Sequence, residues 1–237
     1  MRLDKYLVEC GICSRKEAKS MIKAGRVAVD GITAGAGEDK LDPETAHVCV
    51  DGRELEYERY HYYMLNKPVG YITATEDGRQ QTVLDLFPEE IQRQGIFPVG
   101  RLDKDTTGLL ILTTDGEYAH KVISPTKHVP KLYEAVLNEP ITEQDVLLFK
   151  KGIELSGNIQ CLPAELYAVD GDMCTVRVTI FEGKYHQVKR MFAHCGKNVL
   201  QLKRLSIGAL ELDAKLLPGC YRKMTENEKN QAFFTKK

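Results

Sequence analysis

Three aspartates surround a short apolar run in the segment GRLDKDTTGLLILTTDG, residues 100–116: Asp103, Asp105 and Asp115. A carboxylate can act as a nucleophile or as a general base, so each of them could carry chemistry. The run LLILT predicts a buried strand, and functional residues often sit on loops that such strands hold in place. Asp103 lies on the loop before this strand. Asp115 precedes GEYAHKVI as a helix N-cap would, and Asp105 is expected in solvent. We therefore expect Asp103 to be the reactive carboxylate, the alternative being a cap of the turn after Gly100.

Other catalytic patterns are not supported. Asp105-Thr106-Thr107-Gly108 is similar to the loop of aspartic proteases, but the extra threonine breaks that motif and no second copy supplies the paired carboxylate. The six histidines lie apart, as structural or surface residues would, with neither H-E-x-x-H nor a glycine-rich phosphate loop. We expect no metal and no nucleotide cofactor. Seven scattered cysteines indicate reduced thiols, and Cys10 and Cys13 are expected to pack between helices.

Charge is balanced overall but not along the chain. The net charge is -1, so any attraction to phosphate must come from local patches. Residues 1–26 hold seven basic against three acidic side chains, and residues 181–204 hold six against one. A charged stretch is often only a solvated face, but two basic segments in a chain of balanced charge favour a polyanionic partner.

Residues 1–56 are predicted to form a small domain. Leu3, Tyr6 and Leu7 are at helical spacing, and Ser14 with Glu17 predicts a capping box for a second helix. The strands RVAVDG and HVCVDG each end in the turn pair Asp-Gly. A positive stripe is expected along the second helix at four-residue steps, at Arg15, Lys19 and Lys23. This unit resembles the S4 RNA-binding module, through RLDKYL and CSRKEAKSMIKAGRVAVDG.

The rest of the chain has more strands than helices. ELEYERY, residues 54–60, has few apolar residues, and we take 57–60 as a linker between domain 1–56 and domain 61–237. Strands and helices do not alternate one for one, which favours an α+β fold with a largely antiparallel sheet. No segment approaches the length of a membrane span, and MRLDKYLVECG lacks the apolar core of a signal peptide, so a cytoplasmic protein is expected.

Four segments of domain 61–237 are similar to those of RsuA-type pseudouridine synthases. They are MLNKPVGYI, GRLDKDTTGLLILTTDG, KLYEAVL and EGKYHQVKRMFAHCG. The last looks closer to the small-subunit branch, for which the resemblance implies conversion of one uridine of 16S rRNA to pseudouridine. It also implies a pseudouridine synthase catalytic fold behind the S4-like domain.

The resemblance assigns roles to individual residues. Asp103 matches the aspartate that attacks the target nucleotide or abstracts a sugar proton, and Tyr133 matches the tyrosine that stacks on the uracil and can take its C5 proton. Lys189 stands where many relatives have arginine, and Arg101 matches a contact to the strand around the vacated base. The remaining RNA-binding candidates are basic: Arg2, Arg15, Lys16, Lys19, Lys23, Arg26, Lys184 and Arg190.

The chemistry of a shielded carboxylate also predicts a cationic partner for Asp103. A pocket that encloses a flipped base desolvates the carboxylate and raises its pKa, whereas a cation within ~4–6 Å lowers it by roughly 1–3 units. The basic segment KYHQVKRMFAHCG is expected to be a helix that supplies this cation. Lys189 and Arg190 are adjacent and so point about 100° apart, and we expect only one of them to reach the site.

Two other functions remain open from the sequence. The chain could modify 23S rRNA, or it could be a non-catalytic RNA-binding or assembly factor that retains the fold. The expected partner is ribosomal RNA, and for the small-subunit function it is free 16S rRNA or an assembling small subunit. No membrane is involved, and a monomer is expected.

Overall fold

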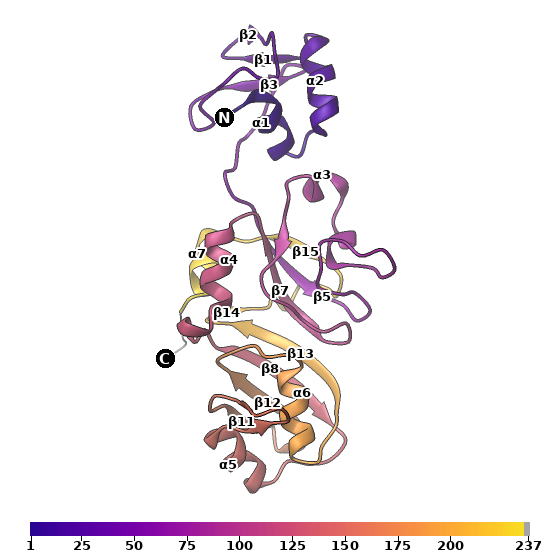
Figure 1. Cartoon of the computed structure of the whole chain (residues 1–237), viewed down its shortest axis with the longest axis vertical. Coiled ribbons are helices and arrows are strands. Elements are labelled where there is room, and N and C mark those ends of the chain that lie inside the picture. Colours follow the sequence, from indigo (N-terminus) through magenta and orange to yellow (C-terminus); the bar gives the residue numbers. More distant parts are fainter. Residues whose placement is uncertain (235–237) are drawn as a thin grey trace. The chain divides into compact units, whose positions relative to one another are not determined.

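The computed structural model describes residues 1–234, which fold into two compact units (Figure 1). One unit holds Met1–His61 together with Phe87–Phe97, and the other holds Tyr62–Leu86 and the chain from Pro98 onward. The predicted domain limits at residues 56 and 61 stay a prediction. Within the described residues no helix combines the length and apolar character needed to cross a bilayer.

The N-terminal unit has the predicted order of elements. Helices α1 (Leu3–Glu9) and α2 (Arg15–Lys23) pack on an antiparallel sheet ordered β2-β1-β3-β4 (Ile32–Thr33, Val27–Val29, Val48–Val50, Arg53–Glu54). The capping box of Ser14 and Glu17 is present. The core contains Leu3, Tyr6, Leu7 and Cys13. Burial raises the pKa of the Cys10 thiol to about 12, and all seven cysteines, each among the described residues, are free. Cys13 belongs to the core and Cys10 packs against it, as expected for packing thiols.

The second unit is built on a twisted mixed sheet. Its main order is β11-β12-β8-β13-β7-β5-β15, and its neighbouring strands are antiparallel except β13 and β7. The α+β expectation is thus confirmed. The strands are β5 (Tyr62–Lys67), β6 (Phe97–Pro98), β7 (Thr107–Thr113), β8 (Lys131–Leu137), β11 (Glu165–Val169), β12 (Asp172–Ile180), β13 (Val199–Ile207), β14 (Leu210–Glu211) and β15 (Tyr221–Lys223), with a separate pair β9 (Glu154–Leu155) and β10 (Ile159–Gln160).

Helices cover this sheet and close its ends. The α-helices are α3 (Glu89–Gln92, grouped with the N-terminal unit), α4 (Gly116–Ile123), α5 (Glu143–Lys151), α6 (Gln187–His194) and α7 (Glu226–Gln231), and the 3-10 helices are η1 (Val83–Leu86) and η2 (Pro125–Lys127). Helix α5 packs on β11 and α6 packs on β13 (Figure 1). Asp115 caps α4 by accepting from two backbone N–H groups, as predicted. Strand β7 lies in the middle of the sheet, and Leu109 to Leu112 are fully buried.

The loop before β7 is fixed from two sides. The Thr73 hydroxyl donates to the Leu102 carbonyl at 2.7 Å and accepts from the Leu102 N–H at 3.1 Å. The fully buried Lys67, at the end of β5, donates from Nζ to the carbonyls of Pro68, Lys104 and Thr106 at 3.0, 3.3 and 2.9 Å. Burial lowers the pKa of Lys67 to about 8, against the opposing effect of Asp105 and Asp103. The Asn-Lys-Pro-x-Gly turn therefore serves as the support of the 103–106 loop.

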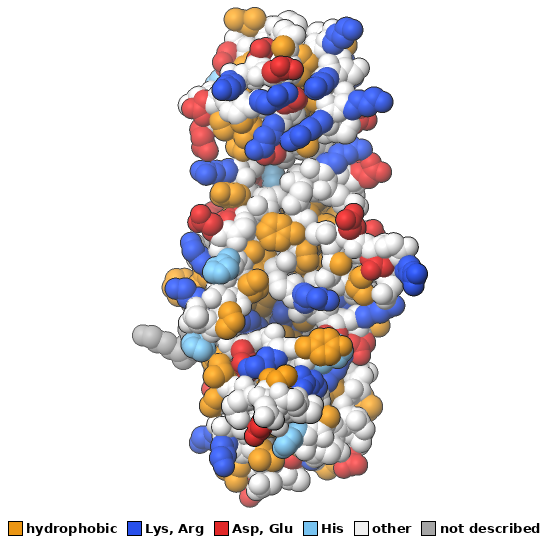
Figure 2. Space-filling model, viewed as in Figure 1, with side chains coloured by type: hydrophobic (Ala, Val, Ile, Leu, Met, Phe, Trp, Pro, Cys, Tyr) orange, Lys and Arg blue, Asp and Glu red, His pale blue; other side chains and the backbone are white. Residues whose placement is uncertain are grey.

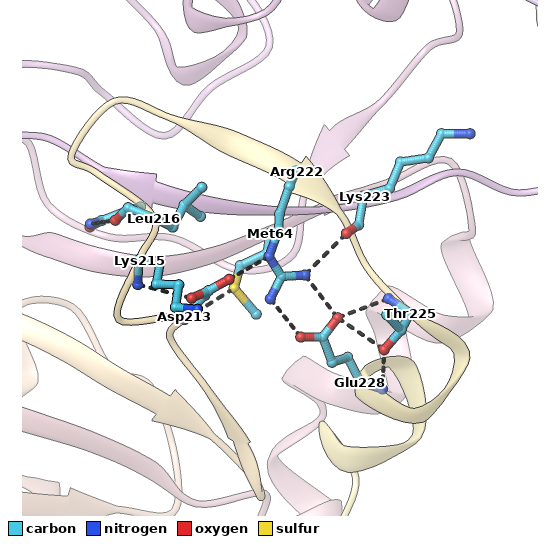
Figure 3. A network of polar contacts seen from close by, with 9 residues as sticks. Met64, Asp213, Lys215, Leu216, Arg222, Lys223, Thr225 and Glu228 are labelled. Atoms are coloured by element: carbon cyan, nitrogen blue, oxygen red, sulfur yellow. Dashed lines mark hydrogen bonds and ion pairs between the residues drawn. The ribbon is translucent and has the colours of Figure 1, made fainter.

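The C-terminal segment is tied to the sheet by one arginine (Figure 3). Arg222 in β15 donates to Asp213 at 2.8 Å and makes two bonds to the Glu228 carboxylate, at 2.7 and 2.9 Å. Glu228 also accepts from the Thr225 N–H at 2.8 Å, which completes a capping box at the start of α7. The bonds from Arg222 lower the pKa of Glu228 to about 2.

The first prediction concerns this network. Glu228 contributes stability that is fully present above its ordinary pKa of 4.5 and is lost as the pH falls toward about 2. Glu228→Gln keeps a capping side chain but removes the charge. We expect it to lower the free energy of unfolding at pH 7 by on the order of 3 kcal/mol at most. Urea unfolding of both proteins from pH 7 to pH 2 checks this, and a difference that does not shrink below pH 4.5 would contradict it.

The second prediction concerns Lys67. Lys67→Met removes the donor from three loop carbonyls, so the loop should open more easily. Two amides report on it: Gly70 N–H, which bonds the Lys104 carbonyl, and Thr106 N–H, which bonds the Asp103 carbonyl. We expect hydrogen exchange at both to accelerate by at least about tenfold, a local loss of roughly 1.4 kcal/mol.

Lys104→Met is the matched control for Lys67→Met. The Lys104 side chain is exposed and bonds Gln80 at the surface, so its loss should leave both amides unchanged. Equal exchange in the two variants would show that Lys67 does not hold the loop.

Candidate active site

Asp103 lies at the centre of a cluster of polar side chains on the second unit. It follows buried Leu102, and its carbonyl accepts from the Thr106 N–H at 3.1 Å, which closes the turn before β7. Its side chain is 26% exposed, so the carboxylate is shielded but reachable. This placement is the one that the sequence predicts for a reactive group.

The expected cation is Lys189. Its Nζ lies 2.9 Å from Asp103 Oδ2 and 2.5 Å from Asp105 Oδ1, so one ammonium serves two carboxylates. Burial works against the charge of Lys189, but the bonds to Asp105 and Asp103 outweigh it and raise the pKa of Lys189. The same contact lowers the pKa of Asp105. Asp105 is exposed, as expected, but its share in the ion pair was not predicted.

Arg190 turns away from this pair. It donates to the Ser156 carbonyl at 2.8 Å and to the Tyr185 carbonyl at 3.4 Å. The expectation that only one of the two adjacent cations reaches Asp103 is confirmed. Arg190 instead ties α6 to the turn between β9 and β10.

One expectation about the basic helix is wrong. Helix α6 begins at Gln187, so Lys184 lies in the turn ahead of it and pairs with Glu182. The reason is local: Gln187 N–H bonds the Lys184 carbonyl at 3.1 Å, and the Gln187 side chain accepts from the Lys184 N–H at 2.9 Å. These bonds close a turn where a longer helix would otherwise start.

His186 is a site residue that the sequence did not reveal. Its Nε2 lies 3.4 Å from Asp103 Oδ1, and it is the left-handed N-cap of α6 with φ 48°. The sequence analysis groups His186 with the structural or surface histidines. The available signal was its position three residues before Lys189, which places both near one side of the start of the helix.

Tyr133 lies in β8, between Val178 of β12 and Arg204 of β13, and it is buried. Lys131 is two residues away and so shares its face of the strand. Arg204 donates from Nε to the Leu109 carbonyl at 2.8 Å, and burial followed by the like charge of Arg204 lowers the pKa of Lys131 to about 8. The sequence analysis missed both buried cations, because their burial depends on distant strands.

Gly108 permits the close approach of β13 to β7. It has φ 98°, and a Cβ there would collide with the backbone of Arg204. Only glycine fits this position, which lies five residues after Asp103 and opposite Arg204 in the parallel pair. The approach of β13, which also pairs with Tyr133 of β8, to β7 is therefore set by backbone contact.

The other predicted RNA contacts are exposed. Arg101 is exposed beside Leu102. On the N-terminal unit, Lys and Arg side chains gather on one face (Figure 2). A pocket of about 500 Å³ there is lined by Arg2, Asp4, Lys5, Arg15, Lys16 and Lys19. Exposed Lys23 lies one turn further along α2, whereas Arg26 pairs with Asp51 at 2.5 Å.

Comparison with known proteins agrees with this arrangement. The family model for RNA pseudouridylate synthases matches residues 61–194, and the S4 domain model matches residues 1–45. A Bacillus subtilis protein named as an uncharacterized RNA pseudouridine synthase, YtzG, is 47% identical over 230 residues, covering 96% of both chains. The ribosomal small subunit pseudouridine synthase A of Vibrio cholerae is 44% identical over 229 residues, covering 96% of this chain and 97% of its own.

A solved crystal structure supports the same assignment for the fold. It is of a pseudouridylate synthase, is 35% identical, covers 98% of this chain and 99% of its own, and has a TM-score of 0.69. The matched residues 61–194 contain the Asp103 loop, Tyr133 and Lys189. The chain therefore belongs to the RNA pseudouridylate synthase family, with an S4 domain at its N-terminal end, and is an isomerase.

Proposed function

We propose that this protein converts one uridine of small-subunit 16S rRNA, uridine 516, to pseudouridine. The observation that carries the proposal is the Asp103–Lys189 ion pair on a loop that Lys67 and Thr73 hold in place. The small-subunit target is supported by the Vibrio cholerae relative, which is named for that activity. Modification of 23S rRNA and a non-catalytic role are the alternatives that the experiments below separate.

The proposed reaction begins with extrusion of the target uridine, at a cost of a few kcal/mol in lost stacking. Asp103 then either attacks the sugar carbon C1′ or takes a sugar proton. In both versions the C1′–N1 bond breaks and uracil leaves with the electron pair. The uracil turns and its C5 forms a bond to C1′. In the first version this bond replaces the bond between Asp103 and C1′, and in the second Asp103 returns the proton to the sugar. The C5 proton is transferred to a base, a role we assign to Tyr133, and N1 takes up a proton. Tyr133 also stacks on the uracil.

Lys189 has an electrostatic part in this scheme. A bound base displaces water and thereby weakens the charged form of Asp103, whereas the ammonium at 2.9 Å favours that form. Lysine serves here in place of the guanidinium found in many relatives. Its compact charge bridges Asp103 and Asp105 without the fixed fork that an arginine would impose.

We also propose a division of labour between the domains. Domain 1–56 captures RNA, residues 57–60 link the domains, and domain 61–237 carries out the chemistry. Pocket residues on the first domain supply phosphate contacts, while Arg101, Lys184 and Arg190 contribute on the second. A monomer without a cofactor, acting in the cytoplasm on free 16S rRNA or an assembling small subunit, stays a prediction.

The third prediction tests the reactive carboxylate. Asp103→Asn cannot attack carbon or accept a proton, so turnover should fall by at least about 10³-fold, equivalent to roughly 4 kcal/mol. RNA affinity should stay within about threefold, because an amide of the same shape leaves the phosphate contacts intact. Pseudouridine is measured in single turnovers by release of a tritium label from uracil C5.

Asp105→Asn is the matched control for Asp103→Asn. It removes the other carboxylate on Lys189 but sits in solvent, so activity should stay within a few-fold. Turnover in Asp103→Asn would reject the assignment of Asp103. Absence of product from the wild type on any ribosomal RNA would favour the non-catalytic alternative.

The fourth prediction tests RNA capture by the S4 domain. Replacing Arg15, Lys19 and Lys23 with alanine should weaken binding and reduce the slope of log K against log salt by about 2, since each phosphate contact contributes roughly 0.7–0.9. The single-turnover rate at saturating RNA should be unchanged.

The double variant Lys150→Ala/Lys151→Ala, at the exposed end of α5, controls for charge removal alone. It should bind RNA with a nearly unchanged slope. A collapse of the single-turnover rate in the S4 variant would contradict the proposed division between domains.

A further inference from the structure

An exposed aromatic pair borders the Asp103 site. Tyr185 is 76% exposed, and its ring stacks on the ring of His186 with centroids 3.8 Å apart and an angle of 18° between the planes. Because His186 Nε2 is 3.4 Å from Asp103 Oδ1, the stack reaches from solvent to the carboxylate. The pair is therefore part of the mouth of the site.

Hydrogen bonds within the protein hold the turn that carries Tyr185 and His186. The Lys184 carbonyl accepts from the Gln187 N–H, the Gln187 side chain accepts from the Lys184 N–H, and the Gln187 amide in turn donates to buried Glu182 at 3.0 Å. The Tyr185 carbonyl accepts from Arg190. A rigid turn loses little conformational entropy when a ligand binds on it.

His186 occupies this turn at an energetic cost. Its φ of 48° lies in the left-handed region, which glycine adopts more readily than residues with a side chain. Histidine adopts this region more often than most residues do, as His128 also does here, and at position 186 it supplies a ring that glycine would lack. The use visible in the structure is to support the Tyr185 ring and to contact Asp103.

The surroundings of the pair suit a nucleobase. An aromatic ring with one free face, beside cations, is the arrangement with which proteins bind unpaired RNA. Lys184 precedes Tyr185, and Lys189 and Arg190 follow within the first turn of α6. Nucleobases stack on such a ring whatever their sequence, while the cations attract the adjoining phosphates.

We propose that the free face of Tyr185 stacks on the nucleobase next to the target uridine and so holds the RNA open around the extruded nucleotide. His186 is a positioning residue that fixes the ring. This proposal rests on the proposed function for the nature of the substrate. It names a substrate contact beyond Asp103, Tyr133 and Lys189.

The fifth prediction follows. With a hairpin RNA containing the 16S segment around uridine 516, Tyr185→Ala should lower kcat/KM about tenfold, mainly by raising KM. Tyr185→Phe keeps the ring and should match the wild type. Tyr167→Ala removes another exposed tyrosine, on strand β11, and should have no effect. His186→Gly should leave the protein at least as stable while lowering kcat/KM.

A double-mutant cycle that combines Tyr185→Ala with a change in the RNA identifies the nucleobase that Tyr185 contacts. An abasic nucleotide is placed in turn on each side of the target uridine. On the side whose base stacks on Tyr185, the abasic nucleotide should lower the kcat/KM of the wild type about tenfold. The kcat/KM of Tyr185→Ala should be almost the same with and without that base. Independent losses at both positions, or no loss from Tyr185→Ala, overturn the proposal and leave the ring as a contact for another protein.

A second readout separates this proposal from the proposed function. With 2-aminopurine in place of the neighbouring base, binding of the wild type should quench fluorescence and binding of Tyr185→Ala should not. If no pseudouridine forms in this RNA but quenching depends on Tyr185, the target is wrong and the stacking contact stands. If pseudouridine forms and both proteins quench equally, the function stands and the stacking contact is wrong.

Discussion

The ammonium of Lys189 lies between Asp103 and Asp105, and the rest of the site is arranged around that contact. It joins helix α6 to a loop more than 80 residues earlier in the chain. Both sides are held: Lys67 and Thr73 fix the loop through its backbone, while Arg190 and the Lys184–Gln187 turn fix the start of the helix. A cation shared by two carboxylates leaves the group with a net negative charge, which suits a reacting carboxylate more than a fully neutralised one.

Two other sets of charges in the second unit are treated differently. Arg222 is fully engaged by Asp213 and Glu228 and serves to hold the C-terminal segment. Lys131 and Arg204 are buried near each other, and among residues 1–234 neither has a carboxylate partner. The first arrangement stabilises the fold through paired charge. The second places uncompensated positive charge on the face of the sheet that carries Tyr133, where a polyanionic substrate would offset it.

The parts of this structure that sequence could predict depend on neighbours along the chain. Ser14, Thr142 and Thr225 form their capping boxes within three residues, and the apolar run after Asp103 is buried as its composition indicates. The residues that the sequence analysis missed or misplaced are positioned by contacts with residues far away along the chain. Lys67 is buried and supports the loop only because the loop folds over it, and Ile72 makes only an isolated bridge to Thr82. The hydrogen bond between Gln187 and Lys184 closes the turn before α6. This turn brings His186 to Asp103 and leaves Lys184 outside the helix.

The parallel pairing of β13 with β7 has a consequence for the order in which the molecule is made. The buried core cluster of the N-terminal unit lies between Leu3 and Val50, so residues 1–61 can fold while the remainder, including the Phe87–Phe97 segment of the same unit, is still being synthesised. Strand β7 must wait for β13, some 95 residues later, before Gly108 meets Arg204. Long-range parallel contacts of this kind form slowly. A nascent chain thus acquires its S4 domain first, and Asp103 gains its cation, Lys189, only late in synthesis.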